Sequence, residues 1–153
     1  MDVNLINPFI DATLNVLETM TSTKAEPGKP YLKKDQVASG DVSGVIGLTG
    51  EARGTISVSF TEKSILAIVS NMFGEEMKEL NEEVKDAVGE ITNMISGDAR
   101  KKLDELGRSL KAAIPTVIMG KNHTISHMTT SPIIAIPFST DNGGFTVEVC
   151  IED

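Results

Sequence analysis

The chain has 153 residues, a formal net charge of −8 at pH 7 and 40% hydrophobic residues, which predicts one globular domain spanning residues 1–153. Its fourteen basic residues form no long block, which argues against binding nucleic acid or an anionic membrane surface. One cysteine excludes an intramolecular disulfide, and the first residues lack a basic leader and a long apolar run. We therefore expect a cytoplasmic protein.

A helix is the first predicted element, over residues 7–20. Asn7 is a suitable N-cap, and Pro8 suits the first turn because its missing N–H would have no partner there. Residues 24–30, with two prolines and a glycine, predict a loop.

A hairpin and a second helix follow. Residues 41–50 and 54–60 predict two strands, because apolar and polar residues alternate in the second of them. Residues 62–73 predict a helix, with Thr61 as its N-cap and Gly74 as its C-terminal stop.

A long helix is predicted from about Asn81 to Leu106, with Glu82 and Glu83 in its positive first turn and Gly107 after its end. The last third of the chain is predicted to be extended in four segments: 114–120, 123–128, 132–138 and 145–152. The sequence DNGG at 141–144 predicts a hairpin turn between the last two.

The order is therefore helix, strands, helix, helix, strands. Short links between strands imply antiparallel pairing, so the expected class is α+β, an antiparallel sheet with helices packed on it.

The long helix has two distinct faces. When successive residues are placed 100° apart, apolar side chains gather on one side: Val84, Val88, Ile91, Ile95, Ala99 and Leu106. Asp86, Glu90, Asn93 and Gly97 gather on the opposite side. Polar residues are ordinary on a solvent face. Gly97 and the neighbouring Gly89, however, make this surface low, which would let the backbone of another molecule approach closely.

The first helix repeats this arrangement. Asp11, Asn15 and Glu18 have the spacing of Asp86, Glu90 and Asn93, but the acid and the amide have exchanged places. They lie opposite an apolar side made of Phe9, Val16, Leu17 and Met20. Strands follow both helices, so the chain reads as two diverged halves related by a pseudo-twofold internal duplication.

Other candidate sites are weaker. The glycines of residues 47–54 lack the Lys-Ser/Thr of a phosphate-binding loop. His123 and His127 could face one way on a strand, but a metal site usually needs three or four ligands, and no Cys or acid cluster supplies the others. We expect no metal site, and no hydrolytic constellation complete within the chain is recognisable.

The sequence resembles the CheC/CheX/FliY family of chemotaxis phosphatases, and its CheX-like members most closely. The family signature is Asp or Ser, three residues, Glu, two residues, Asn, and a proline about twenty-two positions further on. It is present here as Asp86, Glu90, Asn93 and Pro115. The first copy lacks the proline, since Gly40 stands at the corresponding distance from Glu18.

The resemblance implies an activity. The substrate would be a phosphorylated receiver protein of the CheY type, whose phospho-aspartate lies beside Mg²⁺ and a lysine. Glu90 would form a salt bridge with that lysine, and Asn93 would position the attacking water. Asp86 and Pro115 would support the motif, and the chain would need no cofactor of its own.

The resemblance also implies a homodimer joined through the sheet and a single active motif, with the first copy a packing relic. Two alternatives remain open. The exchanged Asn15 and Glu18 could retain activity, and the chain could be a non-catalytic dimeric module that binds a receiver or a motility protein. The sequence does not identify the receiver or the pathway.

Overall fold

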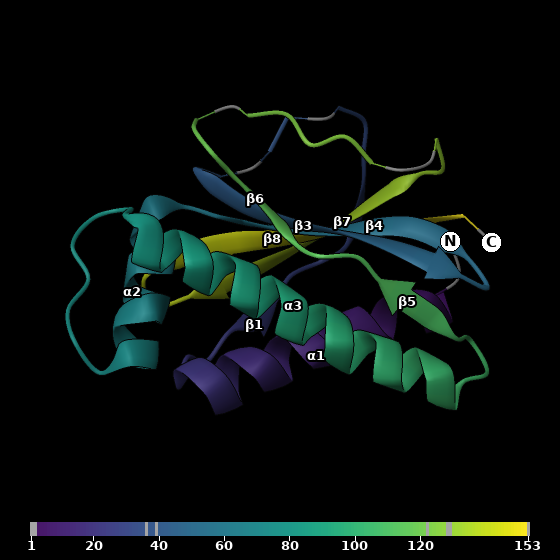
Figure 1. The fold of residues 1–153 in the computed structure, drawn as a ribbon, viewed down its shortest axis with the longest axis horizontal. Coiled ribbons are helices and arrows are strands. Elements are labelled where there is room, and N and C mark those ends of the chain that lie inside the picture. Colours follow the sequence, from purple (N-terminus) through teal and green to yellow (C-terminus); the bar gives the residue numbers. More distant parts are fainter. Residues whose placement is uncertain (1–2, 36, 39, 122, 128–129, 153) are drawn as a thin grey trace.

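The computed structural model describes residues 3–35, 37–38, 40–121, 123–127 and 130–152. The elements in chain order are α1 (Val3–Thr21), β1 (Glu26–Pro27), β2 (Tyr31–Lys33), β3 (Val42–Gly50), β4 (Arg53–Phe60), α2 (Glu62–Phe73), α3 (Glu82–Glu105), β5 (Leu110–Ala112), β6 (Thr116–Met119), β7 (Ile133–Thr140) and β8 (Gly143–Glu152). Figure 1 shows α1 and α3 side by side along the sheet, with α2 near one end of it.

All of these strands pair antiparallel in one sheet. The order is β1-β7-β8-β4-β3-β5, with β2 also on β7 and β6 also on β3. The predicted α+β class is confirmed, and so are the two long hairpins and helices α2 and α3.

The sheet order is symmetric about the β4–β8 pair. The first half of the chain places β1 and β2 on β7 of the second half, and the second half places β5 and β6 on β3 of the first. Exchanging α1 with α3, and β1–β4 with β5–β8, reproduces the same order. This is the pseudo-twofold relation that the repeated helix pattern predicted.

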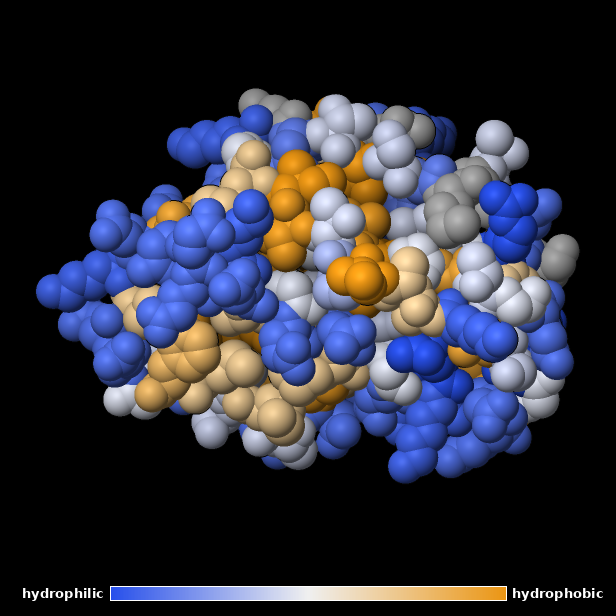
Figure 2. Space-filling model, viewed as in Figure 1, coloured by the Kyte–Doolittle hydropathy of each residue, from blue (hydrophilic) through white to orange (hydrophobic). Residues whose placement is uncertain are grey.

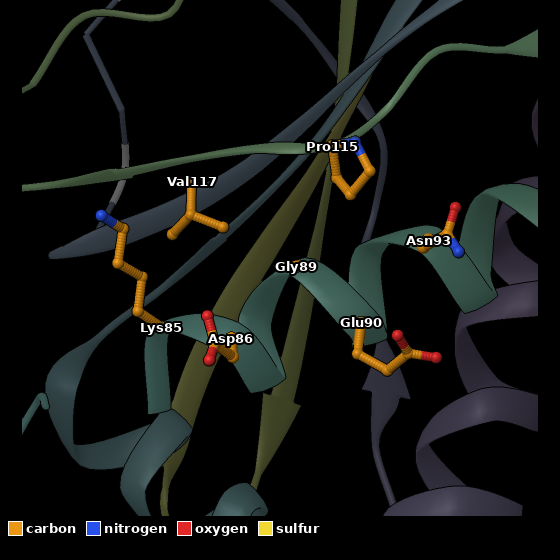
Figure 3. A pocket seen from close by; sticks show the side chains of 7 residues that line it. All are labelled: Lys85, Asp86, Gly89, Glu90, Asn93, Pro115 and Val117. Atoms are coloured by element: carbon orange, nitrogen blue, oxygen red, sulfur yellow. The ribbon is translucent and has the colours of Figure 1, made fainter. Parts of the chain in front are cut away.

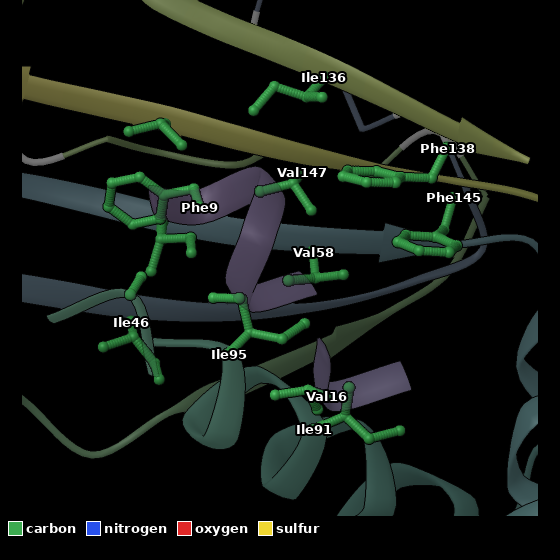
Figure 4. Packing of buried hydrophobic residues seen from close by; sticks show 14 of the residues in the cluster. Phe9, Val16, Ile46, Val58, Ile91, Ile95, Ile136, Phe138, Phe145 and Val147 are labelled. Atoms are coloured by element: carbon green, nitrogen blue, oxygen red, sulfur yellow. The ribbon is translucent and has the colours of Figure 1, made fainter. Parts of the chain in front are cut away.

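One face of the sheet packs on the helices. Buried residues of α1, α3 and the four central strands form one hydrophobic cluster, and Figure 4 labels Phe9, Val16, Ile46, Val58, Ile91, Ile95, Ile136, Phe138, Phe145 and Val147 from it. At Gly44 of β3, helix and sheet approach closely. A Cβ at Gly44 would lie 2.8 Å from the Cβ of Thr92 on α3 and closer still to its hydroxyl oxygen. Glycine at this position therefore sets how near α3 can lie to the sheet.

The opposite face of the sheet is polar, and residues 123–127 and Ser131 contact it. His123 and Ser43 are joined by a hydrogen bond of 2.6 Å between the His123 Nε2 and the Ser43 Oγ. Glu148, fully buried, accepts hydrogen bonds from the Lys33 Nζ at 2.6 Å and the His127 Nε2 at 3.1 Å. The two histidines are thus held separately, each by a residue of the sheet.

The buried Glu148 gives the fold an acid-sensitive point. Burial alone would raise the pKa of Glu148, but hydrogen bonds from His127 and Lys33, together with the positive charge of Lys33, outweigh burial and lower the pKa from its ordinary value of 4.5. A carboxyl with a lowered folded-state pKa stabilises the fold above its unfolded-state pKa, and this contribution is lost as pH falls through the folded-state value.

We therefore expect the free energy of unfolding to fall as pH drops below about 4.5, and Glu148→Gln to flatten part of that decline. At neutral pH the same variant should be less stable by about 3–5 kcal/mol, because Lys33 loses its buried partner. Urea unfolding of both proteins at a series of pH values measures this. Parallel pH profiles would show that Glu148 is not the responsible group.

Some helix predictions were wrong. α1 begins before the expected N-cap, so Pro8 lies inside it. Leu5 and Ile6 of the added turn are buried, and their burial outweighs the hydrogen bond that proline cannot donate. Met20 and Leu106, expected on apolar faces, are 51% and 61% exposed, because each lies where its helix ends and the chain leaves the core.

The strand predictions failed where pairing is short. Residues 123–127, the described part of an expected strand, contain only an isolated bridge between Val37 and Thr124. β1 formed within the expected loop, and β2 and β5 were not foreseen. Each has only two or three residues, so the neighbouring strand and not local propensity decides that it forms.

Candidate functional site

Helix α3 displays the motif. Asn81 caps the helix, its Oδ1 accepting a hydrogen bond of 2.9 Å from the N–H of Val84. Since the apolar stripe that begins at Val84 is buried against the core, the helix cannot rotate without exposing it. Asp86, Glu90 and Asn93 are consequently held on the solvent side, where all three are exposed.

An open hollow of about 420 Å³ lies between α3 and the segment that leads into β6. Its lining residues are Lys85, Asp86, Gly89, Glu90, Asn93, Pro115 and Val117. Figure 3 shows Pro115 and Val117 above the helix, and the side chains of Glu90 and Asn93 together toward one end of the view. The four motif residues predicted from the sequence, Asp86, Glu90, Asn93 and Pro115, thus line one hollow.

Gly89 adjoins a strand of the same chain. It is buried, and a Cβ there would lie 3.4 Å from a methyl group of Val117 in β6. Gly89 also lines the hollow, and the expectation that it lets another molecule approach stays a prediction. Gly97 is half-buried and lies outside this hollow, in a second one beside Arg100 and Lys101.

Lys85 and Val117 were missed from the sequence. Lys85 is the only basic residue among the described residues that line the hollow, but on a helix drawn in isolation it lies at the edge of the polar face. Val117 is placed there by the pairing of β6 with β3, where it is opposite Gly44. The spacing of residues along α3 cannot predict that a residue of a strand, such as Val117 of β6, lies beside the helix.

The chemistry available at the hollow is that of a carboxylate and an amide. The amide of Asn93 can both donate and accept hydrogen bonds, and the carboxylate of Glu90 can bind a cation. Because these groups are exposed, the hollow suits a group that projects from another macromolecule better than an enclosed small molecule. Within the described ranges, no group of three or more His, Cys, Asp or Glu side chains could hold a metal ion.

The first copy of the motif is also on the surface. Asp11, Asn15 and Glu18 are exposed on α1, and the Asn15 amide lies within hydrogen-bond distance, 3.5 Å, of a carboxylate oxygen of Asp98 on α3. The residue just before β2 is Pro30, as Pro115 is just before β6. A proline therefore does stand at the related position. Pro30 is nearer to Glu18 in the sequence than Gly40 is, because α1 ends soon after Glu18, whereas α3 continues well past Asn93.

No helix among the described residues is long and apolar enough to cross a membrane.

Residues 42–139, which include the hollow and exclude α1, match the family model of the chemotaxis phosphatase CheX. The CheY-P phosphatase CheX of Thermotoga maritima is 29% identical over 140 residues, which cover 91% of this chain and 89% of that protein.

Solved structures agree with this match. A CheC-like superfamily protein from Shewanella sp. PV-4 is 47% identical, with a TM-score of 0.93 and full coverage of both chains. CheX in a CheX–CheY–BeF₃–Mg²⁺ complex from Borrelia burgdorferi is 30% identical, with a TM-score of 0.82, over 99% of this chain and 100% of that one. Fold, site and family model coincide, and the chain belongs to the CheX family of chemotaxis phosphatases.

Proposed function

We propose that this chain dephosphorylates a phospho-aspartyl receiver protein of the CheY type. The observation that carries the proposal is the meeting of Glu90, Asn93 and Pro115 at one open hollow. It is supported by the relative named as a CheY-P phosphatase and by the relative found in complex with CheY. The hollow lies within the residues that match the family model.

In the proposed reaction, Asn93 enters the receiver's site and holds the attacking water in line with the phosphorus. Phosphoryl transfer needs positioning and charge stabilisation more than covalent help from the protein. A neutral amide suits this position, because a carboxylate beside the phosphoryl group would be repelled by it. The amide oxygen can accept a hydrogen bond from the water while the amide N–H groups donate to a phosphoryl oxygen.

Glu90 has the docking role. Its exposed carboxylate forms a salt bridge with the receiver's lysine and so fixes the orientation in which Asn93 enters. Mg²⁺ belongs to the receiver and offsets the charge of the phosphoryl group. This chain contributes no cofactor of its own.

The remaining motif residues support these two. Pro115 forms part of the wall opposite α3, and Asp86 lies at the other end of the hollow from Asn93 (Figure 3). On α1, Asn15 is engaged with Asp98, so we assign Asp11, Asn15 and Glu18 to packing and solubility and not to a second active site.

The test mixes this protein at a catalytic ratio with phosphorylated CheY-type receivers and Mg²⁺ and follows the loss of phospho-aspartate. Loss faster than the receiver's own decay, with many turnovers per molecule, supports the proposal. Stable binding of the phosphorylated receiver with an unchanged phosphate lifetime would establish the alternative, a non-catalytic binding module.

We further propose that residues 1–153 act as a single domain in the cytoplasm and form a homodimer through the sheet. β2 lies at a sheet edge and exposes Tyr31 and Leu32, and unpaired edges of this kind favour association. Light scattering during size exclusion at tens of micromolar should give the mass of two chains, about twice 16.4 kDa. A single-chain mass at that concentration would contradict the dimer.

A further inference from the structure

Ile114 is the most exposed large hydrophobic side chain among the described residues. It is 88% exposed, whereas the next, Leu32, is 62% exposed. Figure 2 shows hydrophobic surface at the centre of the face that carries α3, around the segment that leads into β6. Within this region Ile114 and Met119 are exposed and Val117 is half-buried.

The position of Ile114 ties it to the hollow. It directly precedes Pro115, a lining residue, and consecutive Cα atoms are about 3.8 Å apart across a trans peptide. Side chains alternate in direction along an extended segment. Pro115 and Val117 line the hollow, so in an extended segment Ile114 and Thr116 would point away from α3, which would make Ile114 a ridge on the rim.

The residue type and its position before proline restrict the conformations of this ridge before any partner arrives. A residue that precedes proline is restricted to extended backbone conformations, and a β-branched side chain has few χ1 rotamers. An apolar group that is already ordered loses little entropy on binding, which is the property of a good interface anchor. Within the fold, by contrast, an isoleucine this exposed adds little to the core.

The area that a stable complex needs and the charges in the hollow indicate which partner docks here. A stable protein complex covers about 20–30 residues on each side, far more than the seven that line the hollow. A partner whose reacting group enters beside Asn93 must therefore also cover the rim. The hollow carries the carboxylates of Asp86 and Glu90 against the single ammonium group of Lys85, so it favours a partner that is cationic beside that group, as a receiver with its lysine is.

We propose that Ile114 is the apolar anchor on which the phosphorylated receiver docks, a role that rests on the proposed function. The receiver would offer an apolar depression next to its phosphorylation site. Ile114 does not touch the reacting atoms, so it determines affinity and specificity without contributing to the chemical step.

The test measures Kd for CheY-type receivers loaded with Mg²⁺ and beryllofluoride, which stands in for the phosphoryl group, and KM and kcat for the phosphorylated receivers. Ile114→Ala removes three carbons from the interface and should raise Kd and KM about tenfold or more. Ile114→Val should give a smaller rise. In both variants kcat should stay within about twofold of wild type.

Leu106→Ala is the matched control. Leu106 is also an exposed aliphatic residue, 61% exposed, but it lies about 20 Å further along the axis of α3 than Asn93 does, so its variant should bind as wild type does. Because Ile114 and Leu106 are both exposed, neither substitution should change thermal stability.

Each result decides between the hypotheses. An Ile114→Ala variant with wild-type Kd overturns the anchor, even if the protein hydrolyses the phospho-aspartate. If binding depends on Ile114 but no hydrolysis occurs, Ile114 is supported as the docking anchor and the proposed phosphatase activity is refuted. Failure of the wild type to bind any receiver of the panel removes both. A variant that changes only self-association assigns this face to a second copy of the chain and overturns the proposal.

Discussion

Asn93→Ala is expected to lower the rate of phospho-aspartate loss at least about a hundredfold, to the receiver's own decay. The amide would be the only group of this chain that contacts the attacking water, and positioning of that kind accounts for factors of this size. Affinity for the receiver loaded with beryllofluoride should change little, because the contacts of Glu90 and Ile114 remain. Single-turnover decay of the phosphorylated receiver measures the first effect, and a titration measures the second.

Two variants serve as controls for this result. Asn15→Ala removes the equivalent side chain from α1, where it lies near Asp98, and should leave the rate unchanged. Glu90→Ala should weaken binding as well as turnover, because the docking salt bridge is lost. Full activity in Asn93→Ala would refute the water-positioning role. A slow Asn15→Ala enzyme would show that the exchanged first copy is active.

Gly44→Ala is expected to give a large loss of stability, about 1–3 kcal/mol or more. The added methyl group would overlap Thr92 of α3, and an overpacked core responds with backbone shifts of about this cost. The shift would move α3 away from the sheet directly beneath the motif, so hydrolysis should fall too. Urea unfolding measured by circular dichroism gives the change in the free energy of unfolding.

Gly89, which lies on α3 itself, provides the control. A methyl group at Gly89 would make only an ordinary contact of 3.4 Å with Val117, and alanine is preferred to glycine inside a helix by about 1 kcal/mol. Gly89→Ala should therefore be neutral or stabilising. Combining Gly44→Ala with Thr92→Ala should recover part of the loss. A Gly44→Ala protein as stable as wild type would show that the close packing at Thr92 is unimportant.

The helices and strands that were predicted correctly are those whose sequence patterns lie within the element itself. Helix α3 has the Asn81 cap and a regular apolar stripe, and the hairpin of β7 and β8 has its glycine turn. The extent of α1 depended instead on tertiary burial of Leu5 and Ile6. For the same reason β1, β2 and β5 were missed, because strands of two or three residues exist only through their partners.

The candidate site divides in the same way. The sequence placed Glu90 and Asn93 on one face of α3 because helical spacing is fixed by geometry. Pro115 came from the resemblance to a family, and its meeting with α3 depends on how β6 pairs with β3. Lys85 and the fit of Val117 against Gly89 could not be foreseen, because both depend on the path of a segment that periodicity does not describe.

The exchange of edge strands between the two halves bears on how the chain folds during its synthesis. Glu26 of β1 cannot pair with Ser139 of β7 until β7 has been synthesised. In the same way, β3 is synthesised early but can pair with β6 only after the whole of α3 has been synthesised. Such distant pairings form slowly, because a long loop must close before any contact stabilises it. A ribosome-bound chain that stops before β6 would carry Glu90 and Asn93 but lack the wall that faces them. The hollow can thus form only after Val117 has been made, and a chain that stops earlier would have no complete site to offer a receiver.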